Sequence, residues 1–349
     1  MNVRKFFAIM ALILSAVAPR LQGQVHSSSS YAYLLDEEGT SSHIDFLTSP
    51  RIAGRAAGTP QAREVAEYIA AQMESYGLQP FRSVSFFQPF NLPAAGRGQG
   101  TASGSGYSYT DAYRRATGSA VQEDGVKKGY NVVGYLPAAR KDAGYIVIGA
   151  HFDHIGSLGE RFYPGADDNA SGVAAMLELA QAFAQRYKEK GDLGHNIVFV
   201  AFDGNNYSLL GSRHFVSRCG ISHGKITCMI NLDQIGSTLA APGENPEYLL
   251  VLGADKLQPW QKEQMDFANS FFRLGLHLDY TYYGSPEFYN IFYKLSDQQS
   301  FTAAGIPALL FTSGITGHTN KESDVAANLG MPVLQKRIEL IYRFLWLIL

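Results

Sequence analysis

Six short apolar runs constrain the fold of this chain more than any other feature. Each run is apolar at consecutive positions, as expected for a strand that helices cover on both faces. The runs span residues 131–136, 145–150, 196–202, 226–232, 248–252 and 308–311. The pattern predicts a single-domain α/β/α sandwich with a mostly parallel (mixed) central sheet.

Helices are predicted before, between and after these strands from their caps and periodicity. Thr59 is a good N-cap before Pro60, and Gly77 closes a segment with helical spacing of apolar residues. Residues 171–187 carry apolar side chains on one side, and residues 332–347 are strongly apolar. We expect the last of these helices to pack against the sheet.

Composition limits the domain count and the kinds of partner. The chain has 349 residues, of which 46% are hydrophobic and 35 are glycine, and this favours one large domain over a string of modules. A net charge of -2 gives no indication of nucleic acid or anionic membrane as a partner. Residues 95–107 are rich in Gly and Ser without the spacing of a phosphate-binding loop, so a flexible surface loop is predicted there.

The N-terminus resembles a targeting segment. Arg4 and Lys5 precede the apolar run 6–17, and small residues follow it. These features predict a signal peptide over residues 1–23 and a mature domain over 24–349. Because no Cys lies near the expected cleavage region, lipid attachment is not supported. The mature protein is therefore expected to be periplasmic or secreted, without a membrane anchor after cleavage.

The only two cysteines, Cys219 and Cys228, lie close together in the sequence. A disulfide is plausible in an oxidising compartment. Two small buried thiols are an equally good interpretation, so the choice stays open at this point.

Residues of metal-ligand type follow several of the predicted strands. His151, Asp168, Asp233 and His318 are expected at one sheet edge, because ligands of α/β sheets bind beyond the carboxyl ends of the strands. Imidazole and carboxylate are both zinc ligands, and a carboxylate such as that of Asp153 can orient a nearby imidazole. The four ligand-type residues together predict a metal centre.

The motifs that contain these residues resemble a known family. The chain is similar to the secreted zinc exopeptidases of the bacterial leucyl aminopeptidase, aminopeptidase Y and glutamate carboxypeptidase type. The resemblance begins at residues 54–59, continues through 131–134, and extends to 305–308 and to His318-Thr319. Its most specific part is Gly165-Ala166-Asp167-Asp168-Asn169-Ala170-Ser171-Gly172. It implies a zinc-dependent aminopeptidase that hydrolyses peptide bonds at N-termini.

The resemblance also implies roles for individual residues. Asp168 would bridge two zinc ions. His151 and Asp233 would complete one metal site, and His318 would belong to the other. Asp153 would orient His151.

The chain departs from the family where two glutamates are expected. The position of the general base is Asn205, and the position of a ligand to the second metal is Asn206. An amide cannot accept a proton near neutral pH, and a neutral carbonyl oxygen is a poor zinc ligand beside a carboxylate. Ser208 stands where the family has Gly, and Gln298 where many relatives have His. Zero or one zinc ion is therefore expected here, with impaired or absent peptidase turnover.

Three functions remain open from the sequence. The first is a pseudo-peptidase that binds peptides or small peptide-like ligands. The second is an active exopeptidase with an altered or single-metal site, for which Asp203 is a conceivable but unfavoured substitute base. The third is a glutaminyl cyclase, which also relies on acidic residues at the Asn205–Asn206 positions and is therefore less favoured.

Aromatic residues near position 290 are a candidate substrate pocket. Tyr283, Tyr289 and Tyr293 could form a wall for apolar side chains, although ordinary core packing explains them equally well. Histidines without ligand spacing are predicted to be structural or surface residues. They are His154, His195 and His214.

Overall fold

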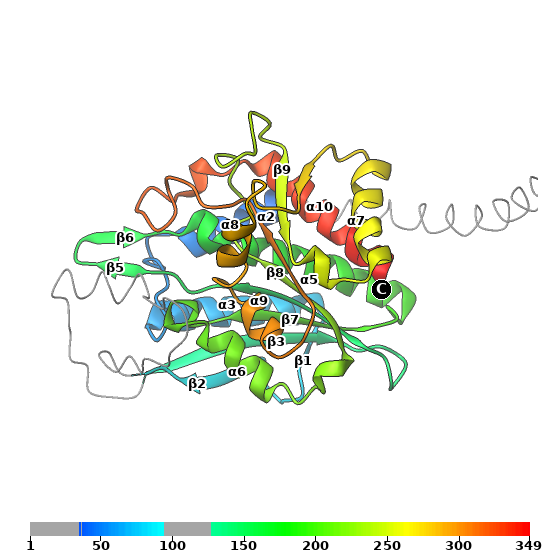
Figure 1. Ribbon diagram of the computed structural model, residues 1–349. Helices are drawn as coiled ribbons and strands as arrows, with labels where there is room; N and C mark the ends of the chain where they lie inside the picture. The colour runs from blue at the N-terminus through cyan, green and yellow to red at the C-terminus, as the bar shows by residue number, and fades with distance from the viewer. Residues whose placement is uncertain (1–34, 36, 94–126) are drawn as a thin grey trace, which may run out of the picture.

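The computed structural model describes residue 35, residues 37–93 and residues 127–349. The predicted signal peptide and the Gly/Ser-rich segment 95–107 lie outside these residues. A nine-stranded sheet forms the centre of the described chain, with the order β1-β3-β7-β4-β8-β11-β9-β10 and with β2 paired to β3 (Figure 1). The strands are β1 (Gln79–Pro80), β2 (Phe87–Asn91), β3 (Lys128–Leu136), β4 (Tyr145–His151), β7 (Asn196–Phe202), β8 (Ile226–Leu232), β9 (Tyr248–Leu252), β10 (His277–Asp279) and β11 (Ala308–Thr312). A separate hairpin joins β5 (Gly156–Leu158) to β6 (Arg161–Tyr163).

The central strands β7, β4, β8 and β11 are mutually parallel, and antiparallel pairs flank them at β3/β7 and β11/β9. The predicted α/β fold with a mostly parallel centre is thus confirmed. Strands β7, β8 and β9 have the predicted bounds. Strand β3 begins at Lys128, before its apolar run, because Lys128 pairs with Asn91 of the neighbouring β2.

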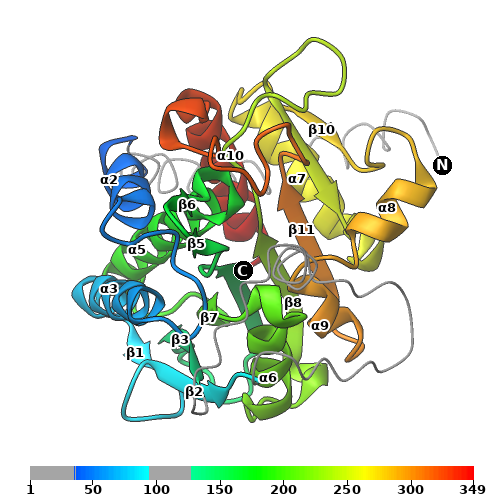
Figure 2. The same cartoon turned by 90° about the vertical axis from the view of Figure 1, so that its left-hand side faces the viewer.

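Helices cover both faces of the sheet, as Figure 2 shows. Those on one face are α2 (Glu37–Thr48), α3 (Pro60–Tyr76), α5 (Gly172–Lys190), α7 (Pro259–Phe271) and α10 (Met331–Ile348). Those on the other face are α6 (Leu210–Arg218), α8 (Pro286–Phe292) and α9 (Gln298–Thr302). Within the described ranges no helix is both long and apolar enough to cross a membrane.

Strand β4 shows why the apolar runs contain few polar residues. Successive side chains of a strand point to opposite faces of the sheet, and both faces are buried here. Ile146 and Ile148 pack into the core beneath α3 and α5, whereas Val147 packs into the opposite core with Phe215 of α6. Because both faces are buried, both sets of side chains must be apolar. This burial on two faces is the physical basis of the sequence pattern.

The predicted caps of α3 are confirmed. The Thr59 side chain accepts a hydrogen bond from the backbone N–H of Ala62, and Gly77 has a left-handed φ of 95°. The two cysteines, Cys219 and Cys228, are both free buried thiols, so the structure contains no disulfide between them.

A buried histidine between α2, α3 and α5 should make stability depend on pH. His43 Nδ1 lies 2.7 Å from the hydroxyl of Tyr68, and its Nε2 lies 3.2 Å from that of Tyr76. Burial lowers the pKa of His43 from 6.5 to about 4, so protonation favours the unfolded chain. Its contribution is complete above the unfolded pKa and is lost as the pH falls from about 6.5 towards 4.

We expect this residue alone to lower the free energy of unfolding by about 2 kcal/mol between pH 7 and pH 5. Urea unfolding at the two pH values measures the loss. His43→Gln keeps a polar partner for the tyrosines without titrating, so its loss over the same interval should be smaller by that amount. Equal losses in the two proteins would contradict the assignment.

Candidate metal centre

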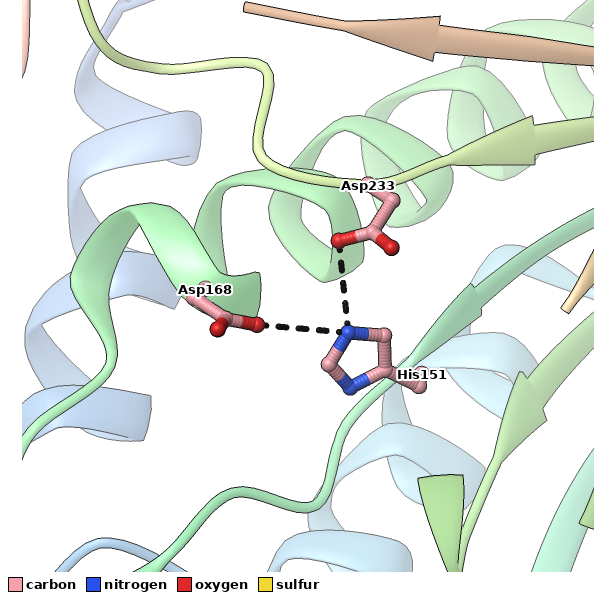
Figure 3. Close-up of side chains that lie close together, drawn as sticks. All are labelled: His151, Asp168 and Asp233. Atoms are coloured by element: carbon pink, nitrogen blue, oxygen red, sulfur yellow. Dashed lines mark hydrogen bonds and ion pairs between the residues drawn. The ribbon is translucent and has the colours of Figure 1, made fainter. Parts of the chain in front are cut away.

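Three of the predicted ligands lie together at the carboxyl edge of the parallel strands. His151 is the last residue of β4, and Asp233 directly follows the adjacent strand β8. Asp168 lies in the kinked segment Ala166–Ser171 that leads into α5, and its backbone is non-helical, with φ -106° and ψ 82°. Figure 3 shows the two carboxylates pointing at the His151 imidazole from different elements.

The distances among these side chains suit one zinc ion. His151 Nε2 lies 3.4 Å from Asp168 Oδ1 and 3.3 Å from Asp233 Oδ1. Two ligand atoms that are each about 2.1 Å from a zinc ion lie about 3.4 Å apart at a tetrahedral angle. All three side chains are buried, and their ligand atoms lie within 4.8 Å of one another. The donor set and its spacing therefore fit one ion.

The charges of His151, Asp168 and Asp233 also favour a cation at this position. Burial by itself lowers the pKa of His151, but Asp233 and Asp168 outweigh this effect and raise the pKa well above its usual value. The carboxylate pair thus attracts positive charge to the position between them, where either a proton on His151 or a metal ion can supply it. A metal ion and a neutral imidazole satisfy both carboxylates at once.

The loop that carries Asp168 is held by charged side chains from distant segments. The Asp324 carboxylate accepts hydrogen bonds from the backbone N–H groups of Asp167 (2.8 Å) and Asp168 (3.0 Å). The fully buried guanidinium of Arg55 donates to the carbonyl oxygens of Gly165 (2.6 Å) and Phe152 (2.6 Å). It also donates to the carbonyl oxygens of Leu47, Pro164 and Asp168. Arg55 lies within the motif of residues 54–59, but residue type and local spacing do not indicate this contact with the Asp168 loop.

Asn169 links the two strands that carry the candidate ligands His151 and Asp233. Its Nδ2 donates to the carbonyl oxygens of Leu232 (2.8 Å) and His151 (3.3 Å). Its Oδ1 accepts hydrogen bonds from the backbone N–H groups of Gly172 and Gln234. One buried amide therefore fixes the ends of β4 and β8 relative to the start of α5.

Asp153 contacts His151 through its backbone. His151 Nδ1 lies 3.1 Å from the Asp153 carbonyl oxygen. The Asp153 carboxylate instead accepts hydrogen bonds from the backbone N–H groups of Asn205 (2.9 Å) and Asn206 (3.5 Å). Burial raises the pKa of Asp153 to about 6, although His151 and the two N–H groups lower it. The residue thus connects the histidine to the Asn205–Asn206 turn.

The two asparagines line the cavity that contains the candidate metal ligands. They begin the 3-10 turn Asn205–Tyr207, and both line the cavity with His151, Asp168 and Asp233. Asn205 Nδ2 donates to Asp297 Oδ2 at 3.2 Å, and Asp297 is completely buried. Asn205 is therefore a hydrogen-bond donor to a carboxylate that does not itself line the cavity.

Asp203 is directed away from the cavity. Its carboxylate accepts hydrogen bonds from the backbone N–H groups of Tyr130 (2.9 Å) and Gly204 (2.8 Å). Burial and the neighbouring Asp153 raise its pKa well above the usual value. Because Asp203 is buried and is absent from the cavity wall, its geometry does not support a role as substitute base.

His318 does not join the ligand group in this structure. Its Nδ1 lies 2.9 Å from Ser323 Oγ, and the cavity is lined instead by its neighbours Thr319 and Asn320. Among the described residues, the three ligand-type side chains grouped around one point are those of His151, Asp168 and Asp233. Metal binding by His318 stays a prediction.

The aromatic wall of the cavity differs from the predicted one. Its aromatic members are Tyr282 and Phe292, whose rings stack with centroids 4.4 Å apart. Tyr283, Tyr289 and Tyr293 do not line the cavity, because their hydroxyls are hydrogen-bonded elsewhere. The acceptors are Ala240 O for Tyr283, Asp255 Oδ1 for Tyr289 and Ala308 O for Tyr293. The sequence shows that this segment is rich in aromatic residues. It does not show which of their side chains face the cavity, because the turn before α8 sets the side-chain directions.

His154, predicted to be structural or a surface residue, also lines the cavity. It is buried, and its Nδ1 lies 3.9 Å from Asp168 Oδ2. Burial lowers the pKa of His154 to about 4, although Asp168 opposes the shift. Its position three residues after His151 was the available sequence signal.

The site thus consists of one histidine and two aspartates that lie beyond the parallel strands of a mixed sheet. Residues 131–345 match Peptidase family M28, and the chain belongs to this family. The resemblance inferred from the motifs is thereby confirmed.

The relatives include proteins described as peptidases. The chain is 37% identical over 115 residues to a probable zinc metalloprotease of Pyrenophora teres f. teres, covering 32% of this chain and 24% of that protein. It is 31% identical over 136 residues to the aminopeptidase YwaD of Bacillus subtilis, covering 38% of this chain and 27% of that protein. The matched part thus spans about a quarter of the length of these curated relatives.

Two solved structures share the fold across most of the chain. A zinc aminopeptidase from Bacillus subtilis matches with a TM-score of 0.64 and 18% identity, over 90% of this chain and 95% of that one. Porphyromonas gingivalis glutaminyl cyclase matches with a TM-score of 0.61 and 18% identity, over 89% of this chain and 98% of that one. At these identities the likeness establishes the fold, which is common to both activities.

Proposed function

We propose that this protein is an M28 homologue that binds peptides or peptide-like ligands at a single-zinc site and has lost most peptidase turnover. The observation that carries the proposal is the pair of amides, Asn205 and Asn206, in the cavity wall beside His151, Asp168 and Asp233. The three ligands suffice to hold one ion, and a bound zinc would supply Lewis acidity towards a ligand carbonyl. The amides supply neither a proton acceptor nor an anionic ligand for a second ion.

The buried carboxylate of Asp297, which contacts the Asn205 side chain, does not replace the missing base. Asp297 accepts the Asn205 amide N–H and is separated from the cavity by that side chain. A general base must reach the proton that it removes, at about 2.6–3.2 Å or through one water. Asn205 therefore keeps the ligand apart from the carboxylate that could otherwise accept a proton.

The rest of the cavity suits a peptide-like ligand. Tyr282, Phe292 and Leu295 form an apolar side, while Gln234, Thr312 and Asn320 form a polar one. A ligand with an apolar side chain and a polar backbone would use both sides. The shared fold alone does not favour glutaminyl cyclisation over peptide binding, since both activities occur on it.

Metal content and turnover test the proposal directly. We expect one zinc ion per chain by elemental analysis and no measurable release of nitroaniline from leucine p-nitroanilide. Removal of the ion with a chelator should lower the melting temperature, because a ligand that binds only the folded state stabilises it. Alanine at His151 should abolish that zinc-dependent stabilisation. Two ions per chain together with steady nitroaniline release would overturn the proposal and favour an active exopeptidase.

A further inference from the structure

Gln234, next to the ligand Asp233, adopts an unusual backbone conformation in the cavity wall. Its φ is 54°, in the left-handed region that non-glycine residues rarely adopt. Hydrogen bonds to both the N–H and the carbonyl oxygen of Gln234 stabilise this conformation. The Gln234 N–H donates to Asn169 Oδ1 (3.0 Å), and its carbonyl oxygen accepts from Ser313 Oγ (2.7 Å) and from the Ser313 N–H. Residues fixed in this way are often found at functional sites.

The side-chain amide of Gln234 is oriented by a second set of contacts. Thr319 Oγ1 accepts a hydrogen bond from the Thr316 N–H and donates its own proton to Gln234 Oε1, each at 3.1 Å. Because Gln234 Oε1 accepts the hydrogen bond from Thr319, the Nε2 group of the same amide points away from Thr319. Within the described part of the chain Nε2 has no hydrogen-bond partner, and Gln234 lines the cavity with Asp168 and Asp233.

We propose that Gln234 Nε2 is the donor that binds the carbonyl oxygen of the ligand, which makes that ligand an amide or peptide. The inference rests on the proposed function and specifies how the ligand is held. An amide N–H requires an acceptor, and a neutral carbonyl oxygen suits a position beside two carboxylates better than an anionic oxygen. Asn206 leaves the cavity without a second cation in this region, so the ligand oxygen gains a contact that the altered metal site does not provide.

A pair of ligands that differ in the carbonyl group tests the contact. L-Leucinamide and isoamylamine share an amine and a branched side chain, but only leucinamide has a carbonyl oxygen. Binding of each to the zinc-loaded full chain is measured by calorimetry. We expect Gln234→Met to weaken leucinamide binding about 5- to 10-fold, the effect of one net hydrogen bond, and to leave isoamylamine binding unchanged.

Gln299→Met is a matched control. Gln299 Oε1 also accepts a hydrogen bond from a threonine hydroxyl, that of Thr302, but Gln299 does not line the cavity. This variant should bind both ligands like the native protein. Gln234→Glu is a second test, because it keeps an acceptor for Thr319 and removes the donor. It should also weaken leucinamide binding selectively.

The outcomes separate this inference from the proposed function. Equal binding of leucinamide by the native protein and both Gln234 variants, at unchanged zinc content, would overturn the role of Gln234 while leaving peptide binding intact. A parallel loss for both ligands would overturn it too, because the effect would then not depend on the carbonyl. If the native protein binds neither ligand at millimolar concentration, the proposed function itself fails, and the inference fails with it.

Discussion

Replacing both Asn205 and Asn206 by glutamate is expected to raise hydrolysis of leucine p-nitroanilide about 100-fold or more. The change supplies a proton acceptor at the cavity and a carboxylate for a second ion, and general base catalysis alone contributes about 10²–10⁴-fold. His151, Asp168 and Asp233 are already in place for the first ion. The initial rate at saturating zinc, together with zinc per chain, measures the gain, and we expect the zinc content to rise towards two.

The Asp297 carboxylate should determine the pH range in which this gain in activity appears. It lies 3.2 Å from Asn205 Nδ2, so Asn205→Glu would bring two carboxylates together and raise the pKa of one of them. Activity should therefore increase with pH through the titration of the new pair. In the background of Asp297→Asn, the same rise should occur at lower pH, because the like charge is removed.

Glutamines at the same two positions provide the matched control. Asn205→Gln with Asn206→Gln adds the same methylene groups but no charge, so it should give no activity and no second ion. If the diglutamate variant folds, binds zinc and still fails to hydrolyse the substrate, the amides at these two positions do not account for the proposed inactivity. Activity of the native protein equal to that of the diglutamate variant would contradict the proposed impairment.

Replacing Arg55 by methionine is expected to lower the free energy of unfolding by about 3–5 kcal/mol, the cost of removing one charge from a buried ionic network. The Arg55 guanidinium is fully buried and donates to several backbone carbonyl oxygens around the Asp168 loop. Burial lowers its pKa to about 10, which leaves it charged at neutral pH, and its charge stabilises Asp168 and Asp324. Urea unfolding measures the loss, and zinc affinity should fall with it because the loop carries a metal ligand.

Arg51 is a suitable comparison for Arg55. Its side chain is 75% exposed and its partner is the carboxylate of Glu64, so Arg51→Met should cost less than about 1 kcal/mol. A loss below 1 kcal/mol for Arg55→Met would mean that the Asp168 loop holds its shape without the guanidinium. An unchanged zinc affinity in a destabilised Arg55→Met protein would separate the role in folding from the role in metal binding.

The sheet could be predicted because its signal is local. A strand covered on both faces must be apolar throughout, and β7, β8 and β9 therefore begin and end where their apolar runs do. Strand β3 extends beyond its run because β2 pairs with it, and pairing between segments so far apart leaves no periodic signal. The caps of α3 were likewise readable, since Thr59, Pro60 and Gly77 act on their own neighbours.

The grouping of His151 and Asp233 at one sheet edge could be predicted for a related reason. Parallel strands end at one edge, so a residue that ends or directly follows such a strand, as His151 and Asp233 do, is placed by topology. The directions of side chains in long connections could not be predicted in this way. Tyr282, rather than Tyr283, faces the cavity, and His318 contacts Ser323, because the surrounding turns set those directions.

The sequence by itself determined the strands and the family resemblance, because each is a matter of residue type and local spacing. It also has amides at positions 205 and 206, where the resemblance predicts carboxylates. Only the tertiary structure decided what the remaining groups contact. Asn205 is bound to Asp297, 92 positions away, Asp203 is turned to Tyr130, and Gln234 is oriented by Thr319. These contacts join segments that are distant in the chain, so their partners are fixed by the packing of the sheet and its connections rather than by any pattern along the sequence.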